Sequence, residues 1–67
     1  MGRYYITLEG KKLSSFTPDT EKQQLVFDGE PIEFNSYIAA ENYILFMAQH
    51  INTKEHEQLQ KLEVGKG

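Results

Sequence analysis

The longest apolar run of the chain lies between Tyr43 and Ala48, where every side chain is nonpolar. Around it, apolar residues recur every three to four positions, which is the spacing typical of a helix that packs on a core. Asn35 or Ser36 can cap the first turn, since either side-chain oxygen can accept a bond from a free amide there. We therefore predict one long helix from about Ser36 to Ile51.

This helix is more apolar than a single sheet can cover. At 100° per residue, its core face contains Tyr37, Ala40, Tyr43, Ile44, Met47, Ala48 and Ile51. Ile38 and Leu45 lie on a flank beyond Glu41, and Phe46 lies nearly opposite the core face. Either another part of the chain folds over these side chains or they form a surface for a partner. The sequence leaves both alternatives open.

An N-terminal strand is predicted from the segment "RYYITLEG" at residues 3–10. Its apolar and polar positions alternate, and its β-branched and aromatic content suits a half-buried strand. Tyr4, Ile6 and Leu8 share one face, and Tyr5 lies on the other. The following "GKK" favours a turn, after which Leu13 and Phe16 can resume an extended segment. "SSFTPDT" favours a loop because Pro18 cannot donate a ladder hydrogen bond.

A hairpin is predicted around Asp28-Gly29, a pair that readily adopts the positive φ angles of tight turns. A four-residue loop, Asp28 to Pro31, keeps the apolar side chains on one face and places Pro31 outside the ladder. The expected cross-strand pairs are Phe27 with Ile32 and Leu25 with Phe34.

The C-terminal segment has two interpretations. Residues 54–63, "KEHEQLQKLE", are rich in strong helix formers, and Thr53 can cap them. Alternatively, "LQKLEV" forms a last strand with Leu62 and Val64 on one face. We favour the helix and expect residues 65–67 to fray.

These elements predict an α+β fold in one domain spanning residues 1–67. A small antiparallel sheet, made of the N-terminal strand and the Asp-Gly hairpin, packs against one long apolar helix, with a short C-terminal helix or strand. A chain of 67 residues leaves roughly 40% of its unfolded surface exposed after folding. It contains no cysteine, which excludes disulfides and thiolate zinc sites as stabilisers. Oligomerisation is the remaining common means.

The charge balance disfavours nucleic-acid and anionic-membrane binding. Ten Asp and Glu face seven Lys and Arg, for a formal net charge of −3, whereas such binding depends on excess basic charge. An alternative nucleic-acid-contact site gathers aromatic and basic residues near the N-terminus, which suits base stacking and phosphate contact. Its residues are Arg3, Tyr4, Lys11 and Lys12.

No established pattern for a catalytic, metal, cofactor or small-molecule site is found. The two histidines, His50 and His56, match no metal-ligand spacing, and no serine lies in a nucleophile elbow. No apolar stretch has signal-peptide or membrane-span length. We therefore expect a cytoplasmic, non-enzymatic protein that binds no cofactor and does not associate with membranes.

The surplus apolar side chains then indicate a protein–protein interaction module. We expect a homodimer, or binding to another protein as a small adaptor or inhibitor. The predicted interface residues are Ile38, Leu45 and Phe46 of the helix, with Tyr5 from the other face of the sheet.

Overall fold

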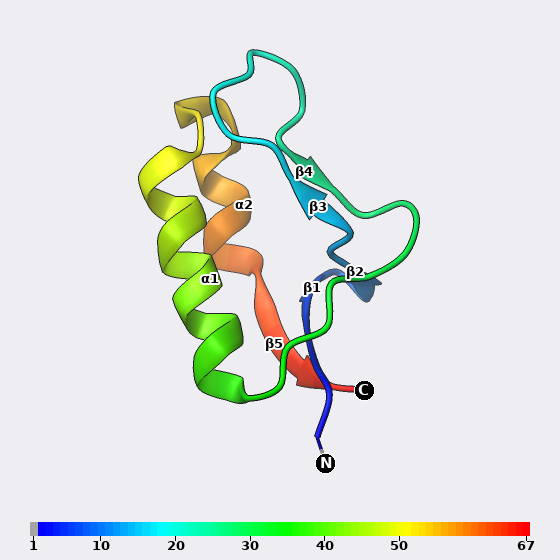
Figure 1. Ribbon diagram of the computed structural model, residues 1–67. Coiled ribbons are helices and arrows are strands. Elements are labelled where there is room, and N and C mark those ends of the chain that lie inside the picture. The colour runs from blue at the N-terminus through cyan, green and yellow to red at the C-terminus, as the bar shows by residue number, and fades with distance from the viewer. Residues whose placement is uncertain (1) are drawn as a thin grey trace.

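The protein has an α+β fold, as the sequence predicts, with two antiparallel sheets, one long helix and a short C-terminal helix (Figure 1). The computed structural model describes residues 2–67. The elements in chain order are β1 (Tyr4–Leu8), β2 (Lys11–Lys12), β3 (Ser15–Phe16), β4 (Leu25–Val26), α1 (Tyr37–His50), the 3₁₀ turn η1 (Thr53–Glu55), α2 (His56–Lys61) and β5 (Glu63–Lys66).

The predicted N-terminal strand is confirmed as β1, the central strand of a three-stranded sheet with the order β2-β1-β5. The turn between β1 and β2 lies at Glu9-Gly10 rather than at "GKK". Both residues have positive φ, 52° and 85°, as the tight turns of two-residue hairpins require. Lys11 and Lys12 therefore belong to a strand, with Thr7 opposite Lys12.

The C-terminal segment forms both a helix and a strand, so each interpretation of the sequence is correct for part of it. After α2, the chain enters β5 and pairs antiparallel with β1, with Tyr5 opposite Gly65 and Tyr4 opposite Lys66. The Gly67 amide donates to the Arg3 carbonyl at 2.9 Å. The prediction that residues 65–67 fray is therefore wrong, because β1 offers them a complete backbone edge.

The prediction of a hairpin around Asp28-Gly29 is wrong, because its two flanking segments do not pair with each other. Leu25 pairs with Phe16 of β3, across a connection of eight residues, rather than with Phe34. Asp28-Gly29 lies in a bend, and Gly29 has a φ of 116°. The turn preference is thus local and real, but the segments that flank it find other partners.

The segment after the bend lies along two other parts of the sheet. The Ile32 amide donates to the Leu13 carbonyl at 3.0 Å, and Phe34 exchanges two backbone hydrogen bonds of 2.9 Å with Tyr4. Phe34 therefore pairs with β1 on the side opposite β5. Tertiary contacts decide the register here, not the turn.

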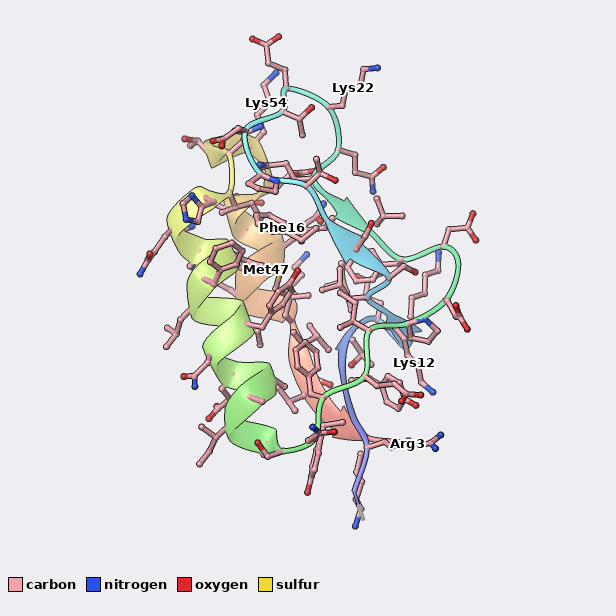
Figure 2. The ribbon with its side chains drawn as sticks, viewed as in Figure 1. Arg3, Lys12, Phe16, Lys22, Met47 and Lys54 are labelled. Carbon is pink, nitrogen blue, oxygen red and sulfur yellow. The ribbon has the colours of Figure 1, made fainter. Side chains whose placement is uncertain are left out.

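The predicted long helix is confirmed as α1, and the Ser36 hydroxyl caps it by accepting the Ala39 amide at 3.1 Å. α1 contacts both β1 and β5, and Met47 points from it toward the strands (Figure 2). The buried core is formed by Ile6, Leu13, Leu25, Ala40 and Met47.

A fully buried side chain, that of Gln24, joins β4 to the end of α1. Its Nε2 donates to the His50 carbonyl at 3.0 Å, and its Oε1 accepts the Asn52 amide at 2.5 Å. Its own amide donates to both oxygens of the Glu55 carboxylate, at 3.1 and 3.0 Å. The first of these bonds satisfies a carbonyl that the last turn of a helix otherwise leaves free.

We expect Gln24→Leu to lower the free energy of unfolding by about 2–3 kcal/mol, because it leaves a partly buried carbonyl and amide without partners. Gln23→Leu is the matched control, since Gln23 is exposed, and should change stability by less than about 0.5 kcal/mol. Urea unfolding of both variants measures the difference. Equal stabilities would show that the Gln24 hydrogen bonds contribute little.

Candidate functional site

Helix α1 has two flanks, one on either side of the row of residues that it buries against the sheet. Ala40 and Met47 are fully buried and mark the side that faces the sheet. At 100° per residue, Tyr43 falls on one side of this line and Ile44 on the other. The two flanks have different surroundings, and only one of them is covered by the chain.

The aromatic flank of α1 is formed by Tyr43 and Phe46, whose rings contact each other and neighbouring aromatic rings. Tyr43 contacts Phe34 at a centroid distance of 5.4 Å and Phe46 at 5.8 Å. Phe46 also meets the edge of Phe16 at 6.0 Å and the His50 ring at 4.9 Å. Phe16, which reaches α1 from β3, lies between the two elements (Figure 2).

Phe46 is therefore covered in part from within the chain, and 44% of it is exposed. The helical periodicity placed it nearly opposite the core and left open whether another part of the chain covers it. That cover comes from Phe16 of β3, at a position where the sequence allowed either an extended segment or a loop. A role for Phe46 in an interface stays a prediction, with a smaller free surface than the sequence indicated.

The open flank of α1 consists of Ile38 and Leu45, which are 68% and 62% exposed. They lie two helical turns apart on the same side of the helix. Together with Ile44, Glu41 and Asn42 they line a shallow groove with a volume of about 270 Å³. The flank therefore offers an apolar surface with a polar centre.

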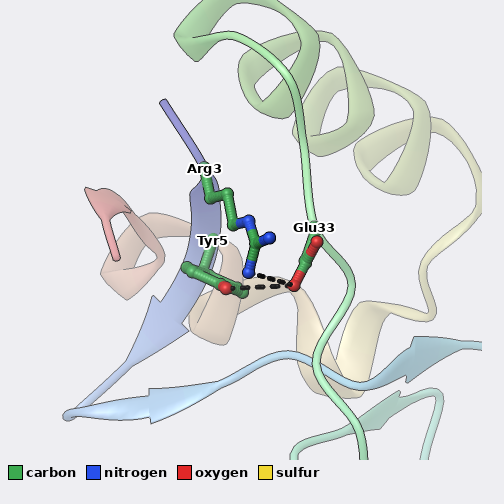
Figure 3. A network of polar contacts seen from close by, with 3 residues as sticks. All are labelled: Arg3, Tyr5 and Glu33. Carbon is green, nitrogen blue, oxygen red and sulfur yellow. Dashed lines mark hydrogen bonds and ion pairs between the residues drawn. The ribbon is translucent and has the colours of Figure 1, made fainter. Parts of the chain in front are cut away.

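Tyr5, the predicted interface residue from the other face of the sheet, is enclosed by its neighbours and is only 8% exposed. Its hydroxyl donates to Glu33 Oε1 at 3.3 Å, and the Lys12 ammonium lies 4.1 Å from its ring centroid. Figure 3 shows Tyr5 and Arg3 converging on the Glu33 carboxylate. The prediction missed this because Glu33 comes from a segment expected in a hairpin elsewhere.

Of the predicted nucleic-acid-contact residues, Arg3 and Lys12 lie near each other around Tyr5 and Glu33, whereas Tyr4 and Lys11 have other surroundings. Arg3 pairs with Glu33 at 3.7 Å, and Lys12 lies over Tyr5. The Tyr4 ring meets Tyr37 edge-on at 6.3 Å. Lys11 lines a separate cavity together with Leu8, Glu9, Gln23, Phe27, Asp28 and Gln58. Neither tyrosine of the N-terminal segment therefore presents a fully free ring beside a free cation.

The histidines have no ligand-like surroundings in residues 2–67. The His50 ring packs on Phe46, and no group of three or more histidine and carboxylate side chains in this part of the chain is placed to hold a metal ion. Within the same residues, none of the helices has the length and hydrophobicity needed to cross a membrane.

Comparisons of the chain with protein-family models, with curated proteins and with solved structures find no match. The function must therefore be inferred from the chemistry of the open flank itself.

Burial on the aromatic flank raises the pKa of Tyr43 above its ordinary value of 10.0. The folded state therefore holds this proton more tightly than the unfolded state. The resulting stability is complete below pH 10 and is lost as the pH rises through the folded-state pKa. We expect the melting temperature to fall more steeply above pH 10 in the native protein than in Tyr43→Phe, as measured by thermal unfolding between pH 8 and 11. Parallel curves would contradict this.

Proposed function

We propose that the protein is a non-enzymatic interaction module that associates with a second copy of itself through the open flank of α1. The observation that carries the proposal is the exposure of Ile38 and Leu45 on one side of α1. Their spacing lets two antiparallel helices place each Ile38 against the partner's Leu45 about a two-fold axis.

The residues between these two apolar positions suit such a pairing. Asn42 and Glu41 line the groove midway between Ile38 and Leu45. In an antiparallel pair, Asn42 comes close to its own copy, and a buried amide pair of this kind fixes the register of paired helices. The two Glu41 carboxylates must remain in water at the rim.

The energetics favour a modest affinity for the flank alone. Fully burying a Leu or Ile side chain gives about 1.5–3 kcal/mol. Four such side chains, each already about one-third covered, then supply roughly 4–8 kcal/mol, while association costs about 4–15 kcal/mol. A standard interface uses about 800 Å² per partner, about one-sixth of the 4905 Å² surface of this chain. The open flank must therefore be part of a larger contact.

Light scattering behind a sizing column, at several loading concentrations, tests the proposal. We expect the mass to rise toward that of a dimer with concentration, and Leu45→Lys to weaken the association at least tenfold. Because Leu45 is exposed, the free energy of unfolding of the monomer should change by less than about 0.5 kcal/mol.

Gln23→Lys is the matched control, since it adds the same charge at an exposed position outside α1. It should associate like the native chain. A dimer that survives Leu45→Lys would exclude the open flank as the interface. A monomer mass up to millimolar concentration would contradict self-association and would favour a different protein as the occupant of the groove.

A further inference from the structure

We infer that the cavity lined by Lys11 is a binding site for a small zwitterion, namely a short peptide with an apolar side chain and two charged ends. The inference goes beyond self-association, because this cavity shares no lining residue with the groove on the open flank of α1. It is carried by the groups that the fold brings together there: an apolar floor, charges of both signs without ion-pair partners, and two carboxamides.

The cavity lies where several distant segments of the chain meet. Its lining comes from β1, the turn that follows it, β2, the residues on both sides of β4, and α2. Its volume is about 680 Å³, which falls in the range of about 300–1,000 Å³ that is typical of sites for small ligands. Because the segments are far apart in the sequence, no local pattern could have indicated this site.

The floor of the cavity is formed by Leu8 and Phe27, which are half-buried. Leu8 lies opposite Lys11 in the ladder of β1 and β2, so the two side chains are on one face of the sheet. This is also the face of Ile6, which lies two residues from Leu8 and is fully buried in the core. Phe27 packs against the same core. The floor is therefore held in place by the fold and offers a contact for an apolar side chain.

Three charged side chains, those of Glu9, Lys11 and Asp28, form an exposed rim around this floor. Across residues 2–67, the ion pair within 4.0 Å is that of Arg3 with Glu33, so the three rim charges have no partner of the opposite sign. A rim that carries both signs of charge is complementary to a ligand that carries both. The two carboxylates suit an ammonium group, and the Lys11 ammonium suits a carboxylate.

The rim also contains the carboxamides of Gln23 and Gln58. The neighbouring Gln24 uses its side chain to bond to two backbone groups, whereas within the described part of the chain neither Gln23 nor Gln58 has a side-chain hydrogen bond to another residue. Each carboxamide offers donors and an acceptor, and a peptide group likewise has one N–H and one carbonyl. A short peptide therefore matches the lining in its ends, its backbone and its side chain.

The backbone of Glu9 supports a role for its carboxylate. Glu9 has a φ of 52° in the turn between β1 and β2, a conformation that glycine, asparagine and aspartate adopt more readily than other residues. The turn therefore does not explain a glutamate at this position. Strained residues concentrate at binding sites, and the Glu9 side chain lines the cavity.

An NMR titration of the ¹⁵N-labelled native chain with the dipeptide leucyl-alanine tests the inference. We expect saturable shifts of the Leu8, Lys11 and Phe27 amides, and no shift at Leu45 on the open flank. The N-acetylated and the C-terminally amidated dipeptides should each bind at least fivefold more weakly, because each has lost one of the two charges.

Variants assign each end of the ligand to its partner. Lys11→Met should bind the dipeptide and its C-terminal amide equally well, because the partner of the ligand carboxylate is gone. Asp28→Asn should reduce the preference for the dipeptide over its N-acetyl form at least threefold. The matched control is Lys54→Met, which removes an exposed lysine outside the cavity and should keep both preferences.

Glu9→Asn separates binding from stability. Asparagine fits the positive φ better than glutamate but is too short to replace its carboxylate, so we expect a higher melting temperature together with at least threefold weaker binding of the dipeptide. A purely structural role of Glu9 would not give these opposite changes.

The inference is overturned if the dipeptide causes no saturable shift up to its solubility limit, or if the shifts map to the open flank. It is also overturned if both capped dipeptides bind as tightly as the free one, or if Lys54→Met loses as much as Lys11→Met. These outcomes are independent of the proposed function, because the mass of the native chain in solution reports on self-association alone.

Discussion

The arrangement of α1 depends on one buried side chain, that of Gln24. Its amide group holds the end of the helix through the His50 carbonyl and the following turn through the Asn52 amide. Polar bonds in a dry site are directional, so they fix the rotation of α1 about its axis as well as its position. That rotation decides which apolar side chains face the core and which remain on the open flank. Apolar packing alone would tolerate several rotations of so hydrophobic a helix.

The parts of the fold that the sequence predicts correctly are those fixed by local patterns. Alternation gave β1, and helical spacing with the Ser36 cap gave α1. The pairing of strands was not predictable, because it depends on partners far apart in the chain. Asp28-Gly29 does bend the backbone, but the strength of a turn says little about which strands it joins. The role of Gln24 has no local pattern at all, since a buried glutamine next to an exposed Gln23 looks the same in sequence.

The residues of the candidate site also fall into two groups, those that a local pattern predicts and those whose surroundings come from distant parts of the chain. The exposure of Ile38 and Leu45 follows from their angle on the helix relative to the core positions, so the sequence was sufficient to find it. Phe46 was placed by the helical periodicity and Tyr5 by the alternation of a strand, but their surroundings come from other elements. Phe16 covers one, and Glu33 binds the hydroxyl of the other. β5 was predicted only in part, because the alternative strand ended at Val64 and residues 65–67 were expected to fray.

The pairing of β5 with β1 also sets the order in which this sheet can be built. β1 is the first element of the sequence and β5 the last, and the Arg3 carbonyl binds the Gly67 amide. The central strand must therefore wait for almost the whole chain before it gains its second neighbour. Closing so long a loop lowers the entropy of the chain before any stabilising contact forms, so this pairing is slower to form than a local hairpin. During synthesis, β1 exists with one edge unpaired, and its apolar face depends on α1 for shelter until the last strand arrives.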